Sequence, residues 1–277
     1  MKDWNLTINY GIKTGLNEAF VVDNNFKNEL ITKEPQATFF LKPLLRGRDI
    51  QRYYPSYQGL WLIYIPKGYT IKTMLHLEED VVSQPIPRYG YVEINQAWEW
   101  FRSRFPLLSN HLFTFKEIAE VRSDMGDYWW EQRACAYLDS FNLPKIIYPN
   151  MTKFLPFVID TEQHFYHNDK SFHILSDRIY WLGAFLNSKL FRYCFRDNFA
   201  ELLGGTRELR KVFFEPIPVK QITIEQEEPF KNLIIKILEC KMQDKPIDTS
   251  SFETQIDQLV YQVYNLTEEE IQIVEGI

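Results

Sequence analysis

The strongest candidates for chemistry in this sequence are basic side chains gathered around a glycine. Residues 42–52 place four cations near one acid, Asp49; the cations are Lys42, Arg46, Arg48 and Arg52. Guanidinium groups bind phosphate oxygens, and Gly47 lets the backbone approach a strand closely. This segment is our best candidate for contact with DNA. In the alternative interpretation, Arg46 and Arg48 pair with Asp49 to pin a buried turn.

A second candidate is the segment Gly11-Ile12-Lys13-Thr14-Gly15. Two glycines around a lysine and a hydroxyl group can present backbone N–H groups to a phosphate oxygen, so we expect Lys13 and Thr14 to contact DNA. The glycine spacing is not that of a nucleotide-binding P-loop. A tight turn between two strands explains the segment equally well.

The third candidate begins at Gly204-Gly205-Thr206-Arg207 and continues to Arg210 and Lys211. A flexible loop followed by three cations can enter a DNA groove. We therefore add Arg207, Arg210 and Lys211 to the predicted DNA-binding residues. A loop that is merely solvated is the alternative.

Other patterns of reactive residues are too weak to predict catalysis or a metal site. Asp160 and Glu162 have the spacing of a metal-dependent nuclease, but His164 stands where a lysine is needed. The histidines at 164, 167 and 173 lack a neighbouring cysteine, and the acids near them are typical of turns. No Ser-His-Asp or Cys-His pattern has a recognisable local context. We predict no catalytic residue and no metal ligand in this chain.

Aromatic residues alternate with arginines in the middle of the chain; they are Trp98, Trp100, Phe101, Trp129 and Trp130. Such residues stack on bases or fill a core, and core packing is the commoner use. We expect sequence-reading residues to vary within the stretch from Tyr69 to Arg133.

The elements that position these residues follow from hydrophobic patterning. Short apolar or β-branched runs predict strands at 60–65, 145–148, 157–159 and 172–175, as parts of a mixed sheet. From Asp177 to Arg196, apolar residues recur at helical spacing.

The sequence pattern changes near residue 215, from mixed strand-like and loop-like segments to apolar residues at helical spacing. Apolar faces predict helices over 229–242 and 252–264, and Thr267 with Glu270 forms a capping-box signature for a last short helix. We therefore predict an α+β fold with two parts: a mixed-sheet domain over 1–215 and a C-terminal helical hairpin over 216–277 that packs on it.

Composition limits the class of protein. Forty-five per cent of the 277 residues are hydrophobic, which suffices for a sizeable core, and the formal net charge is -6. The charge is uneven, since residues 215–277 carry 13 acids against 5 lysines and residues 1–214 carry 24 acids against 26 bases. Three scattered cysteines and the lack of a long apolar run predict a cytoplasmic protein without a membrane segment.

Six segments in fixed order resemble the TaqI-like C-terminal specificity domain of type IIG restriction enzymes and adenine-specific DNA methyltransferases. They are residues 8–20, 41–50, 144–149, 186–190, 215–218, and 256–261 with 266–271. The resemblance covers nearly the whole chain and implies a target-recognition domain for double-stranded DNA.

The resemblance also implies partners outside this sequence. In that family a methyltransferase domain precedes the specificity region, binds S-adenosylmethionine and holds the flipped adenine in an Asn-Pro-Pro-Tyr type motif. Neither that motif nor a glycine-rich cofactor turn occurs here, so we expect no cofactor in this chain. Two other classes compete: an enzyme in its own right, and a protein-interaction domain whose basic segments balance neighbouring acids.

Overall fold

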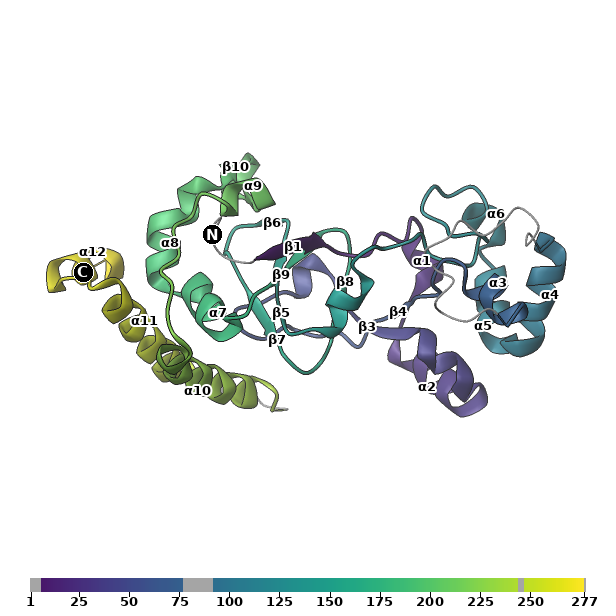
Figure 1. The fold of residues 1–277 in the computed structure, drawn as a ribbon, viewed down its shortest axis with the longest axis horizontal. Coiled ribbons are helices and arrows are strands. Elements are labelled where there is room, and N and C mark those ends of the chain that lie inside the picture. Colours follow the sequence, from purple (N-terminus) through teal and green to yellow (C-terminus); the bar gives the residue numbers. More distant parts are fainter. Residues whose placement is uncertain (1–5, 77–91, 244–246, 277) are drawn as a thin grey trace. The chain divides into compact units, whose positions relative to one another are not determined.

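A computed structural model describes residues 6–76, 92–243 and 247–276 of the chain (Figure 1). The chain divides into two compact units. Unit 1 comprises the described residues of Met1–Gly11, Leu45–Gln58 and Tyr137–Ile277, and unit 2 those of Ile12–Leu44 and Gly59–Ala136. These bounds differ from the predicted division at residue 215, because the C-terminal helices belong to unit 1. The mixture of helices and small sheets confirms the α+β prediction.

A four-stranded antiparallel sheet lies at the centre of unit 1. Its order is β1 (Thr7–Tyr10), β9 (Ser171–Leu175), β5 (Lys145–Pro149) and β7 (Val158–Asp160). Every residue of β5 is buried, as expected for an inner strand with an apolar run. The predicted strands at 145–148, 157–159 and 172–175 are confirmed.

Helices pack on this sheet. The helix α7 (Ile179–Asn187) is buried along almost its whole length, because it contacts β5 and β7 as well as α10 (Ile224–Lys241) and α11 (Ser250–Tyr264). The predicted helix over 177–196 is in fact two helices. Ser188 adopts extended dihedral angles, and its hydroxyl oxygen accepts a hydrogen bond from the Phe191 N–H, which caps α8 (Lys189–Phe195).

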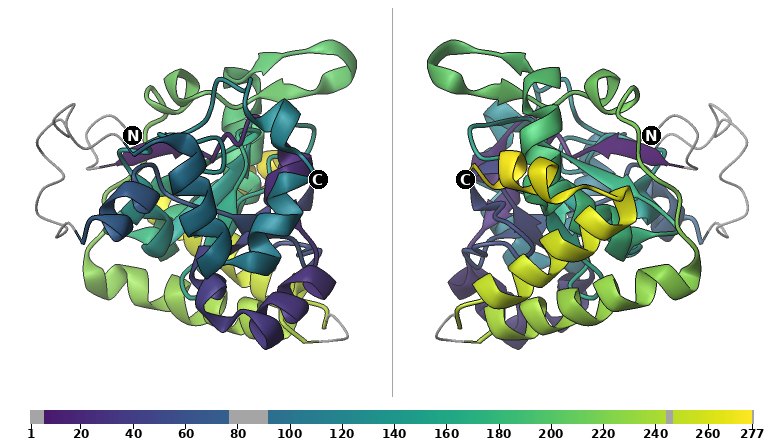
Figure 2. Two further views of the ribbon diagram at one scale, coloured as in Figure 1. Left: turned by 90° about the vertical axis from the view of Figure 1, so that its right-hand side faces the viewer. Right: turned by 90° about the vertical axis from the view of Figure 1, so that its left-hand side faces the viewer.

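The C-terminal hairpin is present as predicted, since α10 and α11 pack against each other (Figure 2). A capping box between Thr223 and Gln226 starts α10 at Ile224, five residues earlier than the apolar pattern indicated. The predicted capping box of Thr267 and Glu270 starts α12 (Glu268–Glu275). Among the described residues, no helix is long and apolar enough to cross a bilayer.

Unit 1 also contains a smaller sheet and several short elements. The sheet has the order β10 (Ala200–Glu201), β11 (Arg207–Glu208) and β6 (Met151–Thr152). Three of the short elements are the 3-10 turn η2 (Gly47–Asp49), the strand β8 (Tyr166–His167) and the helix α9 (Lys211–Phe214).

Unit 2 has its own strands and an aromatic core. The strands run side by side as β2 (Val21–Val22), β4 (Trp61–Ile63) and β3 (Leu41–Leu45), so the predicted strand at 60–65 lies in a different sheet from the other three. The helices are α1 (Asn17–Phe20), α2 (Asn24–Lys33), α3 (Tyr69–Met74), α4 (Ile94–Arg104), α5 (Pro106–Phe113) and α6 (Lys116–Ala119).

The aromatic core of unit 2 confirms the core-packing interpretation. Trp98, Phe101, Trp129 and Trp130 are buried and pack on one another, with the ring centroids of Trp98 and Trp129 4.7 Å apart, whereas Trp100 is only half-buried. Within the stretch expected to carry sequence-reading residues, 77–91 lie outside the described residues.

Candidate nucleic-acid interface

A basic cleft of about 1050 Å³ opens on unit 1. Its walls come from residues 46–52, from 149–156 and from the turn at 168–170, with contributions from α8, α10 and α11. Seven cations and one carboxylate line it, among the described residues: Arg46, Arg48, Arg52, Lys153, Lys170, Arg192 and Lys241, with Glu253. Positive charge is therefore concentrated in one hollow of a protein whose formal net charge is -6.

The turn η2 forms one wall of the basic cleft, and Asp49 holds it in shape. The Arg46 guanidinium binds the Asp49 carboxylate through two hydrogen bonds of 2.9 Å, and the Arg46 backbone N–H donates to the same carboxylate. A Cβ atom at residue 47 would lie 3.0 Å from the Lys170 carbonyl oxygen, so glycine permits a close packing of the chain on itself. Arg46 thus pins a turn, as the alternative interpretation proposed, while still lining the basic cleft.

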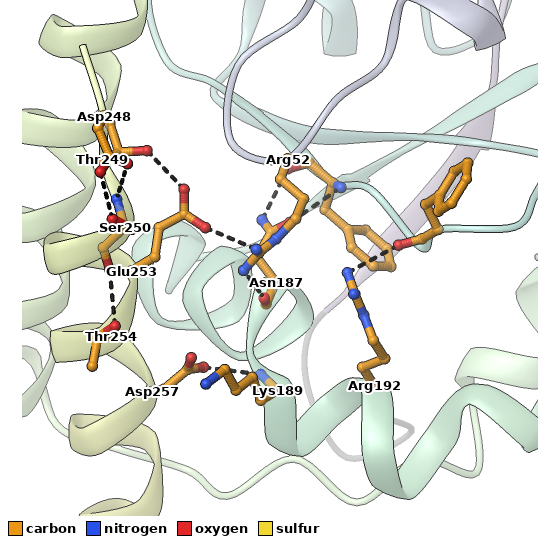
Figure 3. A network of polar contacts seen from close by, with 12 residues as sticks. Arg52, Asn187, Lys189, Arg192, Asp248, Thr249, Ser250, Glu253, Thr254 and Asp257 are labelled. Carbon is orange, nitrogen blue, oxygen red and sulfur yellow. Dashed lines mark hydrogen bonds and ion pairs between the residues drawn. The ribbon is translucent and has the colours of Figure 1, made fainter. Parts of the chain in front are cut away.

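Arg52 is held by partners from two helices (Figure 3). Its Nη1 lies 2.8 Å from Glu253 Oε2, and its Nη2 donates to the Asn187 carbonyl oxygen over 2.7 Å. Glu253 also lies 3.9 Å from the Lys241 ammonium. The one carboxylate of the basic cleft therefore partly neutralises two of its cations.

The same network ties α11 to the loop before α8. The Lys189 N–H donates to Asp257, and the Asn187 amide group donates to the Phe157 carbonyl while accepting from the Phe157 N–H. Burial raises the pKa of Asp257, and the hydrogen bond from Lys189 opposes that rise. The network fixes the helices against which the Arg52 guanidinium is held.

Two other cations are available to a ligand. Arg48 and Lys153 are exposed, and neither makes an ion pair or a hydrogen bond with a residue in the described part of the chain. Lys170 is also exposed, and its ammonium group pairs with the adjacent Asp169 at 3.2 Å. On α8, Arg192 donates to the Phe154 carbonyl, and burial together with the nearby Arg52 lowers its pKa. Because exposed cations without strong partners break few existing interactions when they bind phosphate, they are well suited to that contact.

Amide side chains lie among these cations. Gln51 is exposed, and Asn150 and Asn168 also line the basic cleft. The side-chain oxygen of Asn150 is buried yet makes no hydrogen bond to any described residue, although its backbone groups pair with Lys170 and Leu209. Asparagine and glutamine amides can donate and accept at once, which is what reading a base edge requires.

Two other predicted residues, Lys13 and Thr14, belong to unit 2. Lys13 forms a 3.0 Å ion pair with Asp124. Thr14 is buried, its hydroxyl donates to Asn17, and its carbonyl oxygen accepts a hydrogen bond from the buried Arg122 guanidinium. The contacts of both residues here are within the unit.

Lys42 also lies in unit 2, on β3. Its ammonium group is 5.2 Å from the centre of the Phe39 ring, and burial lowers its pKa. The 42–52 motif is thus divided between the two units, and of its four cations the three arginines line the basic cleft whereas Lys42 does not.

The third group of predicted residues lies around β11. Arg207 is buried and binds Asp197 and Glu201 at 2.9 Å each, so it braces the β10–β11 hairpin. Arg210 is exposed and pairs with Glu208 at 2.8 Å, whereas Lys211 is exposed at the start of α9. None of the three lines the basic cleft, although Thr206 beside them does.

The predicted turn at Asp160 contains a buried ion pair. The ammonium of Lys145 lies 2.7 Å from the Asp160 carboxylate, and both side chains are fully buried. Asp160 also accepts the N–H groups of Gln163, His164 and Phe165. Its role here is therefore to join β5 to β7 and to shape the loop after β7.

His167 and His173 form a buried chain rather than a metal cluster. His167 Nε2 lies 2.8 Å from His173 Nδ1, and Ser171 and Ser140 close the two ends. Burial lowers both pKa values, that of His173 to about 3. In the part of the chain that the structure describes, no three His, Cys, Asp or Glu side chains could hold a metal ion.

Comparison with known families decides the classification. The sequence model of the TaqI-like C-terminal specificity domain matches residues 42–219. The chain belongs to this family. The match includes every segment that supplies the arginines and lysines of the basic cleft except Lys241.

One solved structure shares the fold of the chain. The chain is similar to the type IIL restriction-modification enzyme MmeI, solved in complex with DNA, with 12% sequence identity and a TM-score of 0.54 over 97% of this chain and 34% of that enzyme. It also matches the type IIG restriction endonuclease BpuSI, with 12% identity and a TM-score of 0.43 over 94% of this chain and 31% of that one. The specificity domain spans about a third of these enzymes. No curated protein matches it.

Proposed function

We propose that this specificity domain recognises double-stranded DNA for a restriction-modification enzyme, and that the basic cleft of unit 1 holds the duplex backbone. The observation that carries the proposal is the ratio of seven cations to one carboxylate in a hollow of an acidic protein. Basic side chains along a groove are what phosphate contact requires.

The lining suggests a division of roles. Arg48, Lys153 and Lys170 are exposed on the walls and would contact phosphates, which sets the position of the duplex without reading its sequence. Gln51 would meet base edges, where an amide pairs with adenine in the major groove. Lys13, Thr14, Lys42, Arg207, Arg210 and Lys211 remain proposed contacts outside the basic cleft.

The catalytic partner is a further part of the proposal. An adenine-N6 methyltransferase domain in cis, with or without a nuclease, would hold S-adenosylmethionine and the flipped base. Such an enzyme needs a second surface that holds the duplex in register during extrusion of the base. We assign that task to this specificity domain and expect weak binding when it is alone, because the phosphate contacts would be shared between two domains.

The proposal is tested by fluorescence anisotropy with a mixed-sequence duplex at 50 mM and 200 mM salt. Each phosphate contact contributes about -0.9 to the slope of log affinity against log salt. We expect Arg48→Ala and Lys153→Ala each to weaken binding and to reduce the slope by about one contact. Lys231→Ala removes the same charge from a half-buried position on α10 that does not line the basic cleft, and should leave both quantities unchanged.

Binding that is absent even at 50 mM salt, or that does not respond to Arg48→Ala and Lys153→Ala, would refute the proposal. The alternative is a protein-interaction domain. One observation favours it: Phe113, Ile118 and Val121 of unit 2 are exposed by 53%, 59% and 82% around α5 and α6.

A further inference from the structure

Exposed apolar side chains gather on the small β10–β11–β6 sheet. Leu203, at the tip of the β10–β11 hairpin, is 98% exposed, and the adjacent Leu202 is 39% exposed. On and after β6, Met151 and Phe154 are 52% and 73% exposed. Because exposed apolar surface costs solvation free energy, a cluster of this kind marks a surface for binding.

The hairpin that carries Leu203 is braced. The Leu202 N–H donates to the Thr206 carbonyl over 2.7 Å, and Gly204 and Gly205 take the positive φ angles of 72° and 77° that the tight turn needs. At the base, the buried Arg207 bridges Asp197 and Glu201. The hairpin extends beyond the helices of unit 1 in Figure 2, where it is drawn in green. Leu203 is thus presented by a defined turn.

The tip adjoins the basic cleft. Thr206 at the end of the turn lines the basic cleft, as do Met151 and Phe154. The Lys153 ammonium lies 3.9 Å from the position that a Cβ atom on Gly204 would occupy. An apolar tip therefore stands at the edge of a cationic hollow, and its binding partner must offer negative charge outside and an apolar interior.

We propose that Leu203 is a wedge that enters the base stack of a duplex held in the basic cleft and kinks it at one step. This inference rests on the proposed function. Duplex DNA has anionic backbones around stacked apolar bases, and leucine is among the side chains that proteins insert between base pairs. Partial unstacking costs a few kcal/mol, and the burial of Leu203 with the added phosphate contacts of a bent duplex offsets that cost.

The test uses the full chain and three variants. Leu203→Ser removes the wedge and Leu203→Phe keeps an apolar wedge. Leu143→Ser is the matched control, because Leu143 is 50% exposed and does not line the basic cleft. Duplexes that bind the chain are first enriched from a randomised pool. They are then labelled with 2-aminopurine at successive positions, which reports unstacking, and with a fluorescent donor–acceptor pair at their ends, which reports bending. Anisotropy at several salt concentrations gives affinity and salt slope.

We expect the unaltered chain to raise 2-aminopurine fluorescence at one step and to shorten the end-to-end distance. Leu203→Ser should lose both signals and bind on the order of tenfold more weakly, equivalent to about 1.4 kcal/mol, and its salt slope should be shallower because the phosphate contacts that only the bent duplex makes are lost. Leu203→Phe and Leu143→Ser should retain both signals.

Retention of the unstacking signal and of affinity in Leu203→Ser would overturn the wedge while leaving the proposed function intact. Leu203-dependent binding to phosphatidylserine vesicles without any DNA signal would overturn it in favour of a membrane surface. If no duplex is enriched and no variant shows salt-dependent binding, the proposed function itself fails.

Discussion

Glu253 sets the net charge of the basic cleft, and its neutralisation gives the sharpest test of the electrostatics. The carboxylate faces Arg52 at 2.8 Å and Lys241 at 3.9 Å. Glu253→Gln keeps the size of the side chain and an oxygen that can accept the Thr249 hydroxyl hydrogen bond, but removes one negative charge. We expect DNA to bind more tightly, because the two cations are no longer partly neutralised.

The magnitude follows from Coulomb's law. A unit charge about 7 Å from a phosphate interacts with it by about 0.6 kcal/mol in water and by about 2.4 kcal/mol at an effective dielectric constant of about 20. Screening at 0.1 M salt, where the Debye length is about 10 Å, reduces these values by about half. The expected gain in affinity is therefore about two- to eightfold, and it should shrink as salt is raised.

The assay is anisotropy with the same duplex over a salt series, accompanied by thermal unfolding. Arg52 keeps its hydrogen bond to the Asn187 carbonyl, so the stability loss should be within about 1 kcal/mol. Glu228→Gln on α10 is the control, since it changes the net charge of the chain equally and does not line the basic cleft. An equal gain in both variants, or weaker binding by a folded Glu253→Gln chain, would show that charge in the basic cleft does not govern affinity.

Three further predictions concern the sheet that carries the cleft wall. Asp160→Asn leaves the buried Lys145 ammonium without its counterion and should cost about 3–5 kcal/mol in urea unfolding, and Lys145→Met added to Asp160→Asn should recover part of it, because the uncompensated charge is gone while the asparagine oxygen still accepts loop N–H groups; a single variant as stable as the unaltered chain would contradict this. Burial lowers the pKa values of His167 and His173 in the folded chain, so the unfolded chain binds more protons below pH 6.5. The free energy of unfolding should therefore fall by about 1.4 kcal/mol per histidine for each pH unit below 6.5. His173→Gln should reduce this pH dependence, and an unaltered slope would refute the assignment. Gly183→Ala places a Cβ atom 2.5 Å from Ile159 Cδ1 and should lower stability by about 1–3 kcal/mol in thermal unfolding, whereas Ala184→Gly tests the opposite change on the same helix.

Local pattern was sufficient to predict much of the fold. The strands at 145–148, 157–159 and 172–175 and the capping box at Thr267 depend on neighbouring residues, so the sequence carries their signal directly. The break at Ser188 was missed, because the apolar spacing continues across it while the hydroxyl group caps a new helix. The sheet assignment of 60–65 depends on pairing partners distant in sequence, which periodicity does not reveal.

The candidate site was only partly predictable for a related reason. The motif at 42–52 drew attention to Arg46, Arg48 and Arg52, which do line the basic cleft. The segment 150–154 and Lys170 were missed, because a lysine after a strand has no distinctive local pattern. Whether it lines a cleft depends on residues distant in sequence that fold against it. The one available signal was the Lys153-Phe154 pair, a cation beside an aromatic residue, a few residues after the family segment at 144–149.

The way in which the chain contributes to its two units constrains how recognition can be re-engineered. Unit 2 consists of the two separate segments Ile12–Leu44 and Gly59–Ala136, and the stretch between them returns to unit 1. That stretch carries Arg48 and Arg52, so a single exchanged block running from 12 to 136 would replace part of the basic cleft as well. A chimaera that grafts a new unit 2 must therefore be joined at four points and must preserve residues 45–58. A truncation at any one of these points divides at least one unit.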